Sequence, residues 1–299
     1  DLAGALIKGM VVSSAKTREV REMSMPSSAL MPVKTLSKNA FRFVGNRGDC
    51  DRVIGLGFVV LNNTIITPYH VYEGLEHYEN VRIQSLTSRG ISEISWTSLK
   101  TDLLVHSLTQ ELDFAIFEVG CDFQAKLGLS ALALSHVYPR SPVSVCGCNG
   151  LDTVVEAKGL VNQASKSLTF DHTASTMPSF SGAPIVSKGR LIGMHLGARQ
   201  KVNFGLSLHF LNPLLGSLKK PAIPFVQVES DEVDRSCWRD RTGQDEYDFV
   251  LTNFYQVRDK HGRVIAVDEE KHESRILIAS EAQALWDAQQ EGAPEDYDL

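Results

Sequence analysis

Short apolar runs, each bounded by turn-forming residues, follow one another from about Phe41 to Leu208. In the clearest case, Asn62-Asn63 separates Gly57–Leu61 from Thr64–Thr67, which is typical of a β-hairpin. Further runs of strand length lie at 114–119, 142–146, 184–186, 191–194 and 204–208. Strands at this density, with few segments of helical period, predict an all-β sandwich or barrel.

Composition divides the 299-residue chain into four parts. Residues 1–40 are rich in Ser, Met and Pro, and we expect an N-terminal arm with little structure of its own. The β-rich domain spans 41–218, and the prolines of 219–229 mark a linker. Residues 230–299 carry a net charge of −10, against +4 for the rest of the chain, and are expected to be a largely flexible acidic extension. The extension holds two stretches of strand composition and one of helical composition: Phe249–Val257, Arg263–Val267 and 274–290.

Composition also argues against several classes of protein and site. No run reaches about 18 apolar residues, so no segment is expected to span a membrane. The 5 cysteines lack the spacing of a disulfide framework and are expected to be free thiols in a reducing compartment. Cys146 and Cys148 have no second ligand pair for zinc, so neither a metal nor a cofactor is expected. The chain begins at Asp1 without a signal segment, which suggests a piece of a longer protein.

The stretch 176–184 reads Thr-Met-Pro-Ser-Phe-Ser-Gly-Ala-Pro and precedes a predicted strand. A serine followed by glycine in such a turn is typical of an exposed nucleophile. The small Gly182 lets a substrate backbone approach, and the turn can direct N–H groups at a developing oxyanion. Because Ser-Gly-x-Pro turns are also common in proteins without this activity, Ser181 needs partners to be interpreted as catalytic.

His70 and Asp113 supply those partners. His70 follows an apolar strand where the chain turns, and Asp113 directly precedes another strand. An acid beside a buried strand is costly unless it is partnered, and Asp102 is a rival acid with a less constrained position. Each residue alone is more simply structural, but together they fit one mechanism. Ser181 attacks a carbonyl, His70 transfers the proton, and Asp113 holds the imidazole tautomer.

The part of the chain from about Phe41 to Pro213 resembles a chymotrypsin-like serine protease of a positive-strand RNA virus, of the sobemovirus or sobemo-like type. The order His, Asp, Ser is that of the chymotrypsin-like class, and Gly55–Val60 ahead of Thr67–His70 matches the family's lead-in to its histidine. The resemblance implies a double β-barrel and an endopeptidase whose substrates are viral polyprotein segments.

The same resemblance implies a specificity pocket. Gly193–Gly197 is similar to the Gly-x-His segment of viral proteases, which places His195 in the pocket for the side chain before the scissile bond, together with Thr176. A His and a Thr hydroxyl can hydrogen-bond a Glu or Gln, so cleavage after these residues is expected. The oxyanion hole is expected at the N–H groups of Ser179 and Ser181. Ser179 departs from the family's usual Gly, and a Ser there implies backbone strain.

The acidic extension resembles a second mature protein of a viral polyprotein. Its stretch 236–248 has the Trp-x-Asp and acidic cluster of the genome-linked protein (VPg) that follows the protease in sobemovirus polyproteins. That likeness implies a covalent RNA link, and the sequence leaves the linking hydroxyl open among Ser230, Thr242, Tyr247 and Tyr255. Self-cleavage is predicted between Glu229 and Ser230, where composition changes and prolines keep the approach extended. The implied location is the host cytoplasm, with membrane association only through sequence upstream of this chain.

Two other functional classes stay open at the level of sequence. A cellular trypsin-like protease shares the nucleophile motif, although a secreted one is expected to have paired cysteines. A catalytically silent chymotrypsin-fold binding module is free to lose the three residues, and here all three are present.

Overall fold

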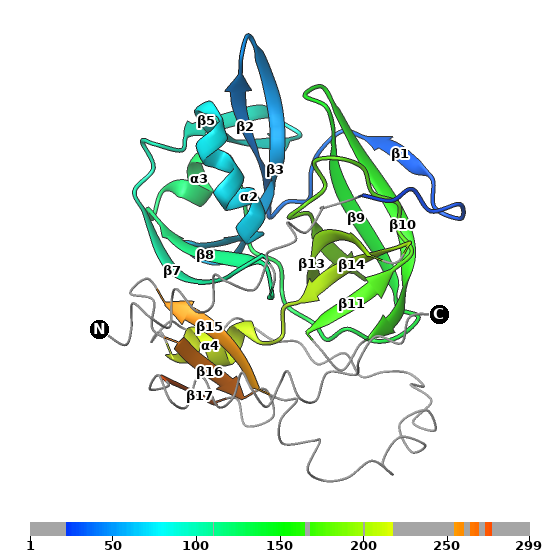
Figure 1. Ribbon diagram of the computed structural model, residues 1–299. Coiled ribbons are helices and arrows are strands. Elements are labelled where there is room, and N and C mark those ends of the chain that lie inside the picture. The colour runs from blue at the N-terminus through cyan, green and yellow to red at the C-terminus, as the bar shows by residue number, and fades with distance from the viewer. Residues whose placement is uncertain are drawn as a thin grey trace, which may run out of the picture. The chain divides into compact units, whose positions relative to one another are not determined.

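The computed structural model describes residues 22–109, 111–164, 168–199, 201–217, 254–259, 264–268 and 273–276. Contacts divide the chain into two compact units, the larger being Thr17–His209 with Ile223–Val226. The larger unit holds two antiparallel β-sheets and the described residues of the candidate active site (Figure 1). No helix in the described ranges is long and apolar enough to cross a membrane.

The first sheet of the larger unit has the strand order β7-β8-β4-β3-β2-β5-β6. Its strands are β2 (Ala40–Arg47), β3 (Cys50–Leu61), β4 (Thr64–Thr67), β5 (Glu79–Thr87), β6 (Gly90–Ser95), β7 (Thr101–Ser107) and β8 (Phe114–Val119). The predicted hairpin around Asn62-Asn63 is confirmed as β3–β4, with Asn63 in the left-handed region at φ 60°. The strand expected over Phe114–Val119 is confirmed as β8.

Aromatic rings fill the core of this sheet. Phe41 and Phe43 are fully buried, and their ring centroids are 5.4 Å apart in an edge-to-face arrangement. Trp96 continues the cluster, edge-on to Phe43 at 5.5 Å and to Phe117 at 5.6 Å. Edge-to-face pairs add about 0.5–1.5 kcal/mol each beyond the area they bury. Short helices follow two of the strands: α2 (Tyr69–Gly74) and η1 (Leu75–His77) come after β4, and α3 (Phe123–Leu127) comes after β8.

The second sheet closes into a barrel. Its strands are β1 (Leu30–Val33), β9 (Pro142–Asn149), β10 (Thr153–Ala164), β11 (Thr169–His172), β12 (Pro184–Ser187), β13 (Arg190–Arg199) and β14 (Val202–Ser207). The long strand β10 pairs with β9 and then, past an irregularity between Val161 and Gln163, with β11. Because β9 also pairs with β12, the order β10-β11-β14-β13-β12-β9 returns to β10.

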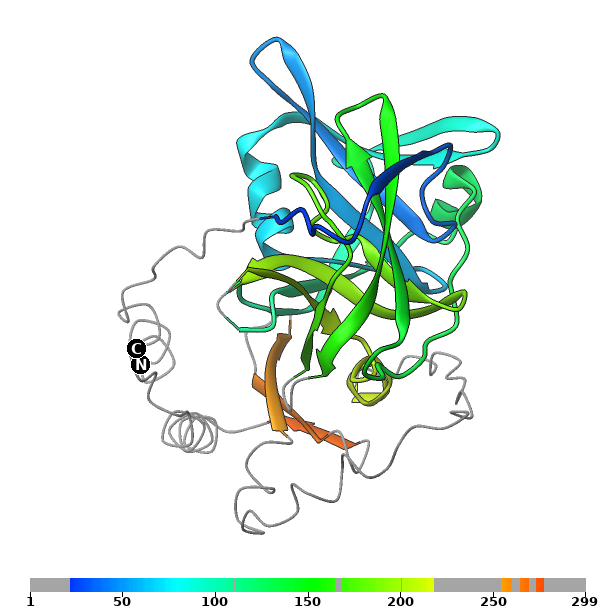
Figure 2. The ribbon, with the colours of Figure 1, turned by 90° about the vertical axis from the view of Figure 1, so that its right-hand side faces the viewer.

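The N-terminal part of the larger unit contributes to the second sheet. Residues 1–40 were expected to form an arm with little structure of its own, yet β1 pairs with β10 from Leu30 opposite Ala157 to Val33 opposite Val154. Both views show β1 lying along β10, although the two strands are far apart in the sequence (Figure 1, Figure 2).

A buried arginine connects the two sheets. Arg42 on β2 is 2% exposed; its Nε donates to Gln84 Oε1 at 2.9 Å, and its Nη1 donates to the Leu151 carbonyl oxygen at 2.6 Å. A buried guanidinium is tolerated only with such partners. Leu151 lies in the turn between β9 and β10, so the contact holds that turn against the first sheet.

The smaller unit contains α4 (Leu211–Ser217), β15 (Phe254–Asp259), β16 (Val264–Asp268) and β17 (Glu273–Ile276). The three strands form an antiparallel sheet against which α4 packs. The acidic extension, expected to be largely flexible, is therefore ordered into strands where the structure describes it. The helical interpretation of 274–290 is wrong at its start, because residues 273–276 pair with β16 as a strand.

Candidate active site

His70 and Asp113 meet at the ends of neighbouring strands. His70 lies in α2, directly after β4, and Asp113 directly precedes β8, which pairs with β4. Asp113 Oδ2 is 2.7 Å from His70 Nδ1, and Asp113 Oδ1 accepts a 3.0 Å hydrogen bond from the His70 backbone N–H. The carboxylate is 1% exposed and the imidazole 18%. These contacts fix the ring and leave Nε2 as the nitrogen for proton transfer.

Local geometry distinguishes Asp113 from the rival acid. Asp113 has a φ of 55°, in the left-handed region, and its backbone N–H donates to the Leu108 carbonyl oxygen at 3.0 Å. Asp102 lies exposed on β7, opposite Glu118, so Asp113 is the acid that contacts His70. A third carboxylate lies nearby: burial and the charge of Asp113 raise the pKa of Glu73.

Ser181 lies in a tight turn where the two sheets meet. Its carbonyl oxygen accepts a 2.8 Å hydrogen bond from the Leu56 N–H of β3, so the first sheet anchors the backbone of Ser181. Gly182 has a φ of 89°, and a Cβ there would clash with the Leu56 carbonyl oxygen. The glycine after the serine is therefore required by both backbone conformation and close approach.

Ser179 has a left-handed backbone conformation, as expected from the strain predicted at this position. Its φ is 80°, in the region that favours glycine, and its hydroxyl donates to the Cys148 carbonyl oxygen at 2.8 Å. The side-chain hydrogen bond offsets part of the backbone strain. The assignment of an oxyanion hole to the N–H groups of Ser179 and Ser181 stays a prediction.

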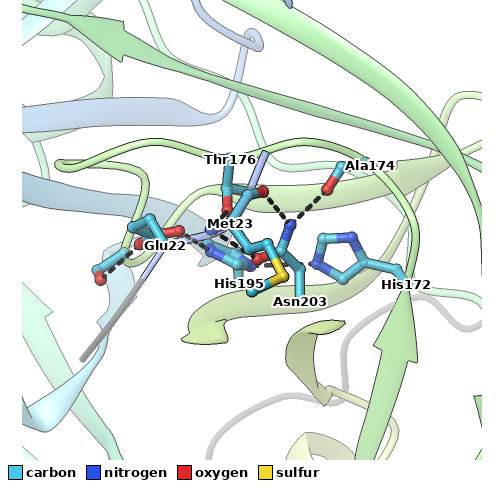
Figure 3. Close-up of polar contacts among 8 residues, drawn as sticks. Glu22, Met23, His172, Ala174, Thr176, His195 and Asn203 are labelled. Carbon is cyan, nitrogen blue, oxygen red and sulfur yellow. Dashed lines mark hydrogen bonds and ion pairs between the residues drawn. The ribbon is translucent and has the colours of Figure 1, made fainter. Parts of the chain in front are cut away.

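His195 and Thr176 lie together beside Ser181, and Asn203 joins them. His195 is fully buried on β13, and its backbone carbonyl accepts the Gly182 N–H at 2.8 Å. Thr176 Oγ1 donates to Asn203 Oδ1 at 2.9 Å. Asn203 on β14, which the sequence reasoning missed, completes a polar group of three side chains around one spot (Figure 3).

A second buried histidine stands behind His195. His172 Nε2 is 3.1 Å from His195 Nδ1, and within the described ranges His172 Nδ1 has no partner. Burial holds the pKa of His172 well below its usual range, and the neighbouring His195 lowers it further, so His172 is neutral. Since no acceptor for an Nδ1–H lies among the described residues, we assign the His172 proton to Nε2, which faces His195 Nδ1. With this assignment His172 donates to His195 Nδ1, and His195 Nε2 carries the proton that faces the Glu22 carboxylate.

The N-terminal segment reaches the polar group of His195, Thr176 and Asn203 (Figure 3). Glu22 Oε2 is 2.7 Å from His195 Nε2, and Glu22 Oε1 accepts a 3.3 Å hydrogen bond from Ser181 Oγ. The carbonyl oxygen of the next residue, Met23, accepts from Thr176 N–H at 2.9 Å and from Asn203 Nδ2 at 2.8 Å. A Ser/Met/Pro-rich segment without a regular hydrophobic period gave no signal for these contacts.

Several predicted residues lie outside the described ranges, including the Glu229–Ser230 bond and the hydroxyls of Thr242 and Tyr247. Tyr255 is on β15. The described cysteines Cys50, Cys121, Cys146 and Cys148 are free thiols. Burial raises the pKa of the Cys146 thiol to about 12, with a smaller contribution from Glu156. Within the described ranges, no cluster of His, Cys, Asp and Glu side chains is arranged to hold a metal ion.

Comparison with known proteins agrees with this geometry. Residues 55–194 match the trypsin-like peptidase domain family. A candidate serine protease of mushroom bacilliform virus is 27% identical over 188 residues, 62% of this chain. A polyprotein of Southern bean mosaic virus is 25% identical over 181 residues, 58% of this chain. The matched regions span only 25% and 30% of those two proteins.

The fold has a counterpart among solved structures. The serine protease domain of the Sesbania mosaic virus polyprotein aligns with a TM-score of 0.50 and 21% identity, covering 61% of this chain and 95% of that domain. The double-sheet architecture is the chymotrypsin-like protease fold, as the sequence predicted.

Proposed function

We propose that this chain, which matches the trypsin-like peptidase domain family over residues 55–194 and is similar to sobemovirus-type proteases, is an endopeptidase that processes a viral polyprotein after Glu or Gln. The proposed catalytic residues are His70, Asp113 and Ser181. The hydrogen-bonded contact between His70 and Asp113, at 2.7 Å, supports the acid–base half of this assignment.

The proposed reaction is acyl transfer. Ser181 Oγ bonds to the carbonyl carbon before the scissile bond while its proton passes to His70 Nε2. The N–H groups of Ser179 and Ser181 donate to the oxyanion. When the intermediate collapses, the departing amine takes the proton from His70. Water then releases the acyl group by the same steps, and Asp113 stabilises the imidazolium each time.

One observation carries the proposed specificity: a glutamate side chain of this chain already lies in the pocket. The Glu22 carboxylate is 2.7 Å from His195 Nε2 while its side chain is only 6% exposed. A buried carboxylate is costly unless donors surround it, so the pocket is chemically suited to an acidic side chain. Thr176 and Asn203 lie beside this contact, where their side chains bond each other and the carbonyl oxygens of Met23 and Ala174.

We extend the proposal to the chain's own junction. Cleavage between Glu229 and Ser230 would separate the protease from the VPg-like segment, whose proposed role is a covalent link to RNA through one of its hydroxyls. Host-cytoplasmic location, with membrane association through upstream sequence, is part of the same proposal.

The test combines a covalent probe with cleavage of the full chain. A fluorophosphonate probe should label the wild-type protein and not Ser181→Ala, and peptide-library profiling should return Glu or Gln before the scissile bond. Ser130→Ala, which removes an exposed hydroxyl, is the matched control and should keep labelling and cleavage. Mass spectrometry of aged protein should find fragments ending at Glu229 in wild type only. Equal cleavage by a folded Ser181→Ala protein, or a preference for Arg, Lys or aromatic residues, would contradict the proposal.

A further inference from the structure

Glu22 occupies the place that a substrate's acidic side chain needs. It contacts both His195, the proposed specificity residue, at 2.7 Å and Ser181, the proposed nucleophile, at 3.3 Å. Ser181 is itself only 6% exposed. A substrate carboxylate and the Glu22 carboxylate cannot both accept the same His195 Nε2–H.

A series of hydrogen bonds holds the segment that carries Glu22. The Met23 backbone bonds Thr176 and Asn203 in both directions, since its N–H also lies 3.2 Å from Asn203 Oδ1. Farther along, Met25 N–H donates to Ser175 Oγ at 2.7 Å, and the Ser28 hydroxyl accepts from the Ser175 N–H at 2.8 Å. Met23, Met25 and Ser28 are therefore bonded to 175–176 and Asn203, and they hold Glu22 beside His195.

We propose that Glu22 is an intramolecular competitor of substrate, so that the full chain rests with its specificity pocket filled by its own carboxylate. The inference rests on the proposed function, because it assumes that the same pocket receives the substrate side chain. A tethered ligand competes at the high effective concentration set by its short connection to Met23. Apparent substrate affinity is then reduced by the fraction of molecules in which Glu22 has left.

Release of Glu22 has a second effect, on the nucleophile. In the described part of the chain, Ser181 Oγ donates its proton to Glu22 Oε1. A hydroxyl held in this way is not presented to His70 Nε2, although the His70–Asp113 contact is already formed. Departure of the carboxylate therefore empties the pocket and frees the hydroxyl in one step.

Binding of a product-like peptide tests the inference without requiring turnover. The probe is an N-acetylated hexapeptide that ends in Glu, so no bond in it is cut, and the protein is the full chain. Glu22→Ala should bind it about 10- to 100-fold more tightly than wild type, which is the range expected for a hydrogen bond to a charged group. Glu22→Asp, whose carboxylate is one methylene shorter, should fall between them. Glu76→Gln removes an exposed carboxylate outside the pocket and should match wild type.

Kinetics on a peptide with an internal Glu separate the possible failures. A Glu22→Ala chain that remains folded by circular dichroism should show a lower KM with kcat changed less. Equal peptide affinity and equal KM for the two proteins, with cleavage after Glu intact, would overturn the competitor alone. Failure of both proteins to bind the Glu peptide, with cleavage after other residues, would overturn the specificity proposal and the competitor together.

Discussion

The two β-sheets of the larger unit build their shares of the candidate site in different ways. On the first sheet, His70 and Asp113 are placed by adjacent strand ends, and two hydrogen bonds between them complete the acid–base pair. On the second, the position of Ser181 depends on Leu56 of the first sheet, and the pocket depends on the N-terminal segment.

We call the half of the site with His70 and Asp113 self-sufficient, and the half with Ser181 and His195 dependent. The two hydrogen bonds of the acid–base pair join residues that the first sheet alone positions. Ser181 and the proposed pocket contact residues distant in sequence, and one of these, Glu22, lies against His195 in that proposed pocket. The proposed competition by Glu22 would therefore act on the half that holds Ser181 and His195.

The largest effect is expected in the self-sufficient half. Asp113→Asn should lower kcat by about 10⁴, because an amide at this position favours the wrong imidazole tautomer. Asp102→Asn, an exposed acid on β7, is the matched control and should retain wild-type rates. Initial rates on a Glu-containing peptide measure both. Equal losses in the two variants would mean that the contact between His70 and Asp113 does not set the rate.

In the dependent half, we expect His172 to act as a positioning residue. His172→Phe removes the hydrogen-bond donor to His195 Nδ1. The His195 proton can then lie on Nδ1 instead of Nε2, the nitrogen that faces the proposed pocket. The ratio of kcat/KM for Glu over Gln substrates should fall about tenfold. His172→Gln keeps a donor and should restore part of the ratio. A merely structural role would lower both substrates alike and leave the ratio unchanged.

A smaller effect tests the strain at Ser179. Replacing Ser179 by Gly relieves the backbone at φ 80° but loses the hydroxyl's bond to Cys148, so the free energy of unfolding should change by less than about 1 kcal/mol. Ser179→Ala loses the bond and keeps the strain. The Gly variant should therefore be more stable than the Ala variant by about 1 kcal/mol in urea unfolding. Equal stability would mean that the turn is not strained.

The smallest effect concerns Glu73, close to the acid–base pair. Its pKa is raised by burial and then by Asp113, so the folded protein binds its proton more tightly than the unfolded chain does. The free energy of unfolding therefore falls as the pH rises from the pKa of Glu73 in the unfolded chain through its raised pKa in the folded protein. Glu73→Gln should raise Tm slightly at pH 7, and the gain should disappear in acid, where wild-type Glu73 is protonated. A pH-independent change in Tm would show that its charge is not the cause.

Much of the fold could be predicted from local sequence, because a β-hairpin is specified by turn residues and flanking strands that are adjacent in the chain. The Asn62-Asn63 turn and the apolar run Phe114–Val119 both formed as predicted. Helix α2 was missed because its six residues are too few to establish a helical period. Residues 273–276 have helical composition, but pairing with β16 overrode that preference.

Prediction of the site had a different limit. His70 and Asp113 could be paired from sequence because each stands at the end of a recognisable strand. Glu22 and His172 could not, since their positions come only from contacts across the folded barrel. Asn203 lies one residue before the apolar run that marked its strand, and only the fold brings it to Thr176.

The order of the two sheets along the chain also determines which sheet is synthesised first. The first sheet of the larger unit is complete in sequence at Val119, whereas β14, which carries Asn203, ends at Ser207, about 90 residues later. At translation rates of ~5–20 residues per second, a ribosome needs on the order of 5 to 20 s to cover that distance. During this interval the nascent chain has its histidine and aspartate but no finished pocket. On the proposed function, a growing precursor would therefore be spared from cleavage by its own chain until the second sheet has emerged.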